Sequence, residues 1–132
     1  MNEALPDLRA RFRFRRGLFR KERVNVPVFE LDTYGCVLKS DKVFEPGDAI
    51  ILDLVMTMPV DEICAQGISG VIIQRRKHCS NFFYSVEFVD PDPQKNPHLN
   101  DRLSRIRSVL NRKQSIQSRR SSGPGAALHK TA

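Results

Sequence analysis

The segment Pro27-Val-Phe-Glu-Leu-Asp-Thr-Tyr-Gly-Cys-Val-Leu38 decides the fold of this 132-residue chain. A largely apolar run leads into the polar Asp32-Thr-Tyr-Gly35, and Cys36-Val-Leu38 is apolar again. A polar, glycine-containing segment between two apolar runs predicts a turn between two strands, with Gly35 able to take a positive φ. Pro27 cannot donate a ladder hydrogen bond, which predicts an edge position or a bulge there.

Alternation of apolar and polar residues predicts the other strands. Arg and Phe alternate over Arg9–Arg15, and we expect Arg20–Arg23 to form a turn before Val24, Val26 and Val28, which share one face. Pro46 and Gly47 are placed as a type II turn requires. The remaining strands are expected over residues 49–56, 63–74 (bent or bulged near glycines 67 and 70) and 82–89, with a polar hairpin connection over 75–81.

One helix is expected after the strands. Asn96 before Pro97 is typical of an N-cap followed by proline at the first helical position. Spacings of four, three and four give the helix one apolar face, formed by Leu99, Leu103, Ile106 and Leu110. The helix is expected to fade near residues 112–117. The prediction is an all-β, six-stranded barrel with one C-terminal helix: a flexible lead-in over 1–8, the domain over 9–112 and a basic, disordered tail over 113–132.

Charge is unevenly distributed along the chain, whose net charge is +7. Residues 1–23 hold eight Lys or Arg against three Asp or Glu, residues 24–98 hold six against eleven, and residues 99–132 hold eight against one. Basic ends around an acidic middle favour an anionic partner, such as a nucleotide, a nucleic acid or a membrane surface, or they serve solubility alone.

The sequence argues against several classes of function. It contains no nucleophile elbow and no glycine-rich phosphate loop, so we expect a binding protein rather than an enzyme. Three widely spaced cysteines without a CxxC pair predict reduced thiols and no metal site. No run of about 18 apolar residues predicts a membrane span. The N-terminus lacks an apolar signal region, so a cytoplasmic location is expected.

Arginine offers the most distinctive chemistry. Its planar guanidinium grips phosphate with two parallel hydrogen bonds and stacks on bases. Pairs four residues apart place both side chains on the same side of a strand, either as a phosphate grip or as a solvated face. These pairs are Arg9/Arg13, Arg11/Arg15 and Arg16/Arg20.

In order, these pieces resemble the PilZ domain family, whose members are bacterial receptors for cyclic di-GMP. The resemblance covers about residues 9–110 and is most specific in Glu45-Pro-Gly-Asp48 and in Tyr84-Ser-Val-Glu-Phe-Val-Asp90, where Ser85 replaces a frequent glycine of the family. The resemblance implies a six-stranded barrel with a helix after the last strand. The nucleotide signature of the family is RxxxR ahead of the first strand and (D/N)xSxxG at the turn that leaves the second.

The signature is altered in this chain. Glu30-Leu-Asp-Thr-Tyr-Gly35 lies where (D/N)xSxxG belongs, with Glu30 for Asp or Asn and Asp32 for Ser. RxxxR fits either Arg9–Arg13 or Arg16–Arg20, and the first pair is better placed relative to the first strand. The resemblance thus implies phosphate and guanine contacts by one arginine pair and base contacts at the turn. The implied ligand residues are Arg9, Arg13, Arg16, Arg20, Glu30, Asp32 and Gly35.

Two functions follow from the resemblance, with cyclic di-GMP as a ligand rather than a cofactor. The first is a cyclic di-GMP receptor or effector in bacterial signalling that governs motility, pili or biofilm. The alternative is a degenerate PilZ adaptor that binds a protein partner and no nucleotide, because the Asp32 carboxylate would lie close to bound phosphate. A third and weaker hypothesis is nucleic-acid binding by the Phe/Arg strand and the basic tail.

Overall fold

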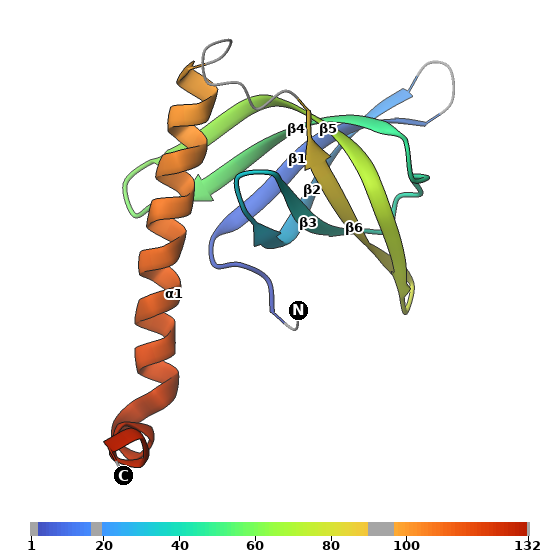
Figure 1. Cartoon of the computed structure of the whole chain (residues 1–132). Helices are drawn as coiled ribbons and strands as arrows, with labels where there is room; N and C mark the ends of the chain where they lie inside the picture. Colours follow the sequence, from blue (N-terminus) through green and yellow to red (C-terminus); the bar gives the residue numbers. More distant parts are fainter. Residues whose placement is uncertain (1–2, 17–19, 90–96, 132) are drawn as a thin grey trace.

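The structure is a computed structural model that describes residues 3–16, 20–89 and 97–131, with the side chains of residues 3–13, 22–89 and 97–116. The strands form a closed antiparallel barrel in the order β1-β2-β3-β6-β5-β4, and one helix follows it (Figure 1). The elements are β1 (Leu8–Arg16), β2 (Arg20–Leu31), β3 (Gly35–Ser40), β4 (Ala49–Thr57), β5 (Glu62–His78), β6 (Asn81–Phe88) and α1 (Pro97–Thr131). The predicted fold class is therefore confirmed.

Alternating side chains build the core of the barrel. Apart from Ser40 in β3, the inward positions of the described strand side chains are apolar and almost fully buried, whereas most of their neighbours face outward. The largest strand side chains that are fully buried are Leu8, Val28, Leu38, Leu52, Leu54, Met56, Ile72 and Tyr84. Pairing of β1 with β4 closes the barrel and removes the exposed sheet edges that would otherwise invite aggregation.

The expected backbone irregularities occur at Gly47 and Gly67 but not at Gly70, and the bulge expected at Pro27 lies just after it. A bulge between Val28 and Glu30 follows Pro27, which pairs with β1 just before the β2–β3 pairing begins. The Glu45–Asp48 turn closes with a hydrogen bond from Asp48 N to Glu45 O of 3.0 Å, and Gly47 has φ of 99°. In β5, Gly67 has φ of 71° at a bulge, whereas Gly70 keeps a regular pairing.

Two predicted connections are wrong because strands continue through them. Residues 20–23 lie in β2, where pairing with β1 extends to Arg16 opposite Arg20, and the residues between the two strands lie outside the described part of the chain. Strand β5 runs to His78 and β6 begins at Asn81, which leaves a two-residue loop in which Cys79 has φ of 56°. In both hairpins, the hydrogen bonding of paired strands outweighs the turn tendency of the polar residues.

Helix α1 begins at Pro97, as predicted, whereas Asn96 lies outside the described residues. It continues to Thr131, beyond the predicted end near 112–117. Its apolar face buries Ile106, Val109 and Leu110 in the core of the barrel, with Leu99 and Leu103 packed against them. No helix in the described part of the chain is long and apolar enough to cross a membrane. The predicted lead-in and tail boundaries stay predictions.

Helix α1 lies along one side of the barrel (Figure 1), and three of its basic side chains bind to the barrel end of the chain. Arg102 donates to the Cys64 carbonyl oxygen (2.9 Å), and Arg107 donates to Oγ1 of Thr33. Lys113 Nζ contacts Oδ2 of Asp7 at 2.6 Å and the Thr57 carbonyl oxygen at 3.1 Å. This end holds the β2–β3 turn, so the helix lies directly beside the turn.

Candidate functional site

The Asp32 side chain organises the β2–β3 turn. Its Oδ1 accepts hydrogen bonds from the backbone N–H groups of Tyr34 (2.7 Å) and Gly35 (2.9 Å), and Asp32 N donates to Gly35 O (3.0 Å). This is the local side-chain-to-backbone bonding for which aspartate is favoured in turns. The Asp32 carboxylate therefore has a structural role in this turn.

Gly35 is needed for space rather than for a positive φ. Its φ is not positive, which corrects the expectation from the sequence. It pairs with Glu87 of β6, and a Cβ built on it would lie 2.1 Å from the Val86 carbonyl oxygen. A side chain would therefore separate β3 from β6 just beyond the turn.

Tyr34 is held rigidly and exposed. Its N–H donates to Asp32, and its carbonyl oxygen accepts from Phe88 N at 2.7 Å. The residue is nevertheless 71% exposed. The backbone of this aromatic residue is thus fixed before any partner arrives, which limits the conformational entropy lost on binding.

A shallow groove of about 490 Å³ runs over the outer face beside the turn. Gly35 and Ser85 lie on its lining. Ile73, bulged from β5 and 54% exposed, adds an apolar side chain to the same groove as Tyr34. We call it the turn groove; it is lined by Glu30, Leu31, Asp32, Tyr34, Gly35, Cys36, Val37, Ile73, Ser85, Val86 and Glu87.

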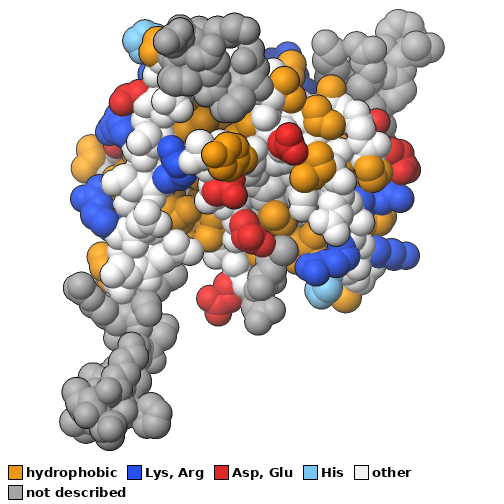
Figure 2. All heavy atoms as spheres, viewed as in Figure 1, with side chains coloured by type: hydrophobic (Ala, Val, Ile, Leu, Met, Phe, Trp, Pro, Cys, Tyr) orange, Lys and Arg blue, Asp and Glu red, His pale blue; other side chains and the backbone are white. Residues whose placement is uncertain are grey.

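The turn groove is acidic. Glu30, Asp32 and Glu87 line it and are exposed, and no ion pair within the described part of the chain neutralises them. Figure 2 shows acidic side chains gathered over the middle of this face. The chain as a whole carries +7, so the groove is a local reversal of the overall charge.

A second hollow, of about 460 Å³, lies between the turn and α1. Glu30, Asp32 and Thr33 line one side of it, and Arg107 of the helix lines the other. Nε of Arg107 is buried without a hydrogen-bond partner, while Nη1 donates to Thr33. The cation that lies at the turn therefore comes from the helix.

The predicted arginines lie elsewhere. Arg9 of β1 donates from Nε to Oδ1 of Asn25 (3.1 Å) and from Nη2 to the Asn25 carbonyl oxygen (3.2 Å). Arg13 is exposed, pairs with Arg23 across the hairpin and lines a separate hollow with it. Neither lines the turn groove or the hollow beside α1.

The other predicted ligand residues are only partly described. Arg16 and Arg20 pair at the end of the β1–β2 hairpin, and their side chains lie outside the described residues. Glu30, Asp32 and Gly35 are brought together in the turn groove, as expected. The ligand-binding role of all these residues stays a prediction.

Glu87 and Arg107 are the residues that the sequence did not indicate. Glu87 joins the site only through the pairing of Gly35 with Glu87 across β3 and β6. Arg107 joins it through the docking of α1. The one available signal was the outward position of Glu87 beside Val86 and Phe88 in the last strand, and nothing marked Arg107 among the arginines of the helix.

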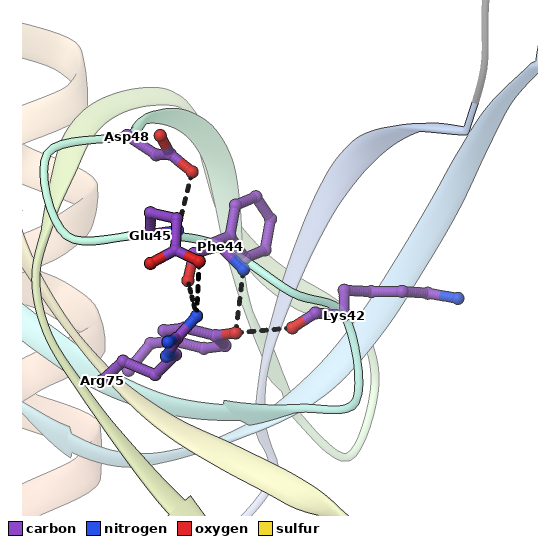
Figure 3. Close-up of polar contacts among 6 residues, drawn as sticks. Lys42, Phe44, Glu45, Asp48 and Arg75 are labelled. Carbon is purple, nitrogen blue, oxygen red and sulfur yellow. Dashed lines mark hydrogen bonds and ion pairs between the residues drawn. The ribbon is translucent and has the colours of Figure 1, made fainter.

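A polar network fixes the β3–β4 connection on the opposite side of the core (Figure 3). The Tyr84 hydroxyl donates to the Lys42 carbonyl oxygen (2.6 Å) and accepts from Phe44 N (2.9 Å). Arg75 Nη1 donates to the Phe44 carbonyl oxygen (3.0 Å) and to Oε1 of Glu45 (2.9 Å). Burial raises the pKa of Tyr84, although the Phe44 hydrogen bond acts in the opposite direction.

The three cysteines are free thiols in three different environments. Cys36 is buried beside the turn, Cys64 is half-buried and Cys79 is exposed. Burial, with a smaller contribution from the negative charge of Asp32, raises the pKa of Cys36 to about 12. Cys36 is therefore a neutral core residue rather than a nucleophile.

No protein-family model matches this chain, and no curated protein matches it. The structure itself shows a six-stranded closed antiparallel barrel followed by one helix, with an acidic groove on its surface beside the β2–β3 turn.

Proposed function

We propose that this chain is a PilZ-like module of bacterial cyclic di-GMP signalling that works as a protein-binding adaptor and holds no nucleotide at its Glu30–Gly35 turn. It is a binding module without a reaction of its own. The observation that carries the proposal is the cluster of exposed carboxylates of Glu30, Asp32 and Glu87 around the turn.

Electrostatics disfavours phosphate at this cluster. Two like charges 4 Å apart repel by about 1 kcal/mol in water and about 4 kcal/mol near a protein surface. A dinucleotide would bring two phosphates towards three carboxylates. The Arg9 side chain is bonded to Asn25, and Arg13 lines another hollow, so neither supplies compensation at the turn.

A receptor for cyclic di-GMP is the second candidate, and Arg107 is the observation that favours it. Its guanidinium lies at Thr33 with Nε unpartnered, so one cation does lie beside the turn. In this alternative, binding alters a surface that faces a protein partner.

Restoring the family's residues at the turn separates the two candidates. The double variant E30D/D32S removes one charge and gives position 32 a hydroxyl that still accepts from the turn N–H groups. If the ancestral site has been lost through these two changes, E30D/D32S gains cyclic di-GMP binding that the wild-type chain lacks. Equal binding by both proteins would support the receptor instead. D32N is the matched control, because it removes the same charge and keeps the acceptor oxygen.

A further inference from the structure

We propose that the turn groove binds a basic segment of a partner protein through an arginine that stacks on Tyr34; this inference rests on the proposed adaptor function and names the chemistry of its partner. Charge is the first reason. Glu30, Asp32 and Glu87 line the groove and have no ion-pair partner among the described residues. Opposite charge across an interface steers encounter and suppresses wrong partners.

The basic ends of the chain contrast with this charge. Residues 1–23 and 99–132 hold sixteen Lys or Arg against four Asp or Glu, whereas residues 24–98 hold six against eleven, so a basic partner is repelled by the ends and attracted by the acidic middle to which the groove belongs. In Figure 2, Lys and Arg side chains lie along α1 at the left and near the tip of the β5–β6 hairpin at the lower right.

Tyr34 is the second reason. Exposed tyrosines with a fixed backbone are frequent anchors in protein interfaces, because a large rigid ring makes contact at low entropic cost. Three hydrogen bonds hold the turn at Tyr34: two to its own N–H and carbonyl oxygen and one from Gly35 N to Asp32. A guanidinium stacks on such a ring while its N–H groups reach neighbouring carboxylates, which an ammonium does less well.

The lining of the groove determines which residues of the partner segment can lie on either side of the arginine. Ile73 is 54% exposed on the same surface, so the arginine should be next to an apolar residue. The groove continues past Val37 and Ser85 into a small hollow lined by Arg76 and Phe83. The basic end of the partner therefore lies at the turn, and its far end avoids positive charge. The barrel is closed, so the segment binds by its side chains and not by adding a strand.

Fluorescence anisotropy with the full-length chain tests this inference. The probe is a labelled five-residue peptide of alternating Arg and Leu, compared with the same peptide carrying Lys or Glu in place of Arg. We expect saturable binding of the Arg peptide, weaker binding of the Lys peptide, none of the Glu peptide, and a loss of affinity at high salt.

Matched variants locate the binding. E30Q/D32N/E87Q removes three charges in the groove and keeps the acceptor at position 32, whereas D41N/D61N/E62Q removes three exposed charges elsewhere. We expect the groove variant, and Y34A, to weaken the Arg peptide by about tenfold, with the control variant unchanged. No saturable binding of the Arg peptide, or an equal loss in both triple variants, would overturn the inference. Cyclic di-GMP is titrated in parallel: nucleotide binding by the wild-type chain refutes the proposed adaptor function, whereas peptide binding reports only on the partner.

Discussion

The backbone of Gly35 lies so close to that of Val86 that a Cβ on Gly35 would stand 2.1 Å from the Val86 carbonyl oxygen. This contact joins the β2–β3 turn to the last strand and brings Glu87 to the turn groove. The glycine that marks the turn in the sequence therefore serves the packing of two strands, and the site depends on that packing.

Substitution of Gly35 by alanine should destabilise the protein by about 3 kcal/mol, at the upper end of overpacking effects, because the obstacle is backbone rather than a mobile side chain. G47A is the matched control: nothing lies within 4 Å of its added Cβ, and only the positive φ resists it. It should cost about 1–2 kcal/mol. Urea denaturation of both variants provides the comparison, and a G35A loss no greater than that of G47A would contradict the backbone contact.

Removal of the Tyr84 hydroxyl should cost about 1–3 kcal/mol in the free energy of unfolding, because Phe44 N and the Lys42 carbonyl oxygen lose their partner. Y34F removes a hydroxyl from an exposed ring and should change stability by less than about 0.5 kcal/mol. Thermal unfolding of Y84F and Y34F measures the difference. Equal melting temperatures would show that the Tyr84 network does not fix the β3–β4 connection.

The hydrogen bonds from the Tyr34 and Gly35 N–H groups to Asp32, which we call the Asp32 cap, predict different outcomes for two substitutions at position 32. D32A leaves the N–H groups of Tyr34 and Gly35 without their acceptor and should cost about 1 kcal/mol, by analogy with helix capping residues. D32N keeps an acceptor oxygen and should be nearly neutral. Amide hydrogen exchange at Tyr34 and Gly35 reports the cap directly: faster exchange in D32A alone is expected, and unchanged exchange in D32A would refute the cap.

Cys36 should make the protein sensitive to alkali. The pKa of Cys36 in the folded protein, about 12, lies above the ordinary value of 9.0. The contribution of the protonated thiol to the free energy of unfolding is therefore complete below pH 9 and is lost as pH rises towards 12. Each proton released only on unfolding costs about 1.4 kcal/mol per pH unit in this range. The decline in stability between pH 9 and 11 should therefore be shallower in C36A than in the wild-type chain.

Thiol labelling checks the same environment independently. Cys79 should react with a thiol reagent at once, and Cys36 only when the protein unfolds. C79A provides the control that identifies the fast thiol. Rapid labelling of Cys36 in the folded protein would contradict its burial.

Much of the fold could be predicted because a barrel imposes period two on its strands. The inward residues of β2, β4 and β6 follow the alternation closely, and the face of α1 follows its helical spacing. The predictions failed where a hairpin arm is polar. In β5, Arg75 and Arg76 lie over the rings of Phe82 and Phe83 on β6, at 5.3 Å in each case. Cross-strand pairs of arginine with phenylalanine stabilise this part of β5, although its sequence shows no alternation of apolar and polar residues that would predict a strand.

The candidate site was less predictable because it is assembled from distant elements. Glu30, Asp32 and Gly35 lie within six residues of one another in the chain and could be identified from the sequence alone. Glu87 comes from β6 by register, and Arg107 comes from α1 by docking. The resemblance implied that an arginine pair and the turn would contact one ligand. In the structure, Arg9 instead donates hydrogen bonds to Asn25.

Isothermal titration of the wild-type chain with cyclic di-GMP tests the central claim most directly. If the carboxylates of Glu30, Asp32 and Glu87 exclude phosphate from the turn, no heat of binding will be detected up to high micromolar nucleotide, and the amide resonances of residues 30–35 will not move. Saturable binding with shifts at those residues would contradict the adaptor proposal and establish the chain as a receptor.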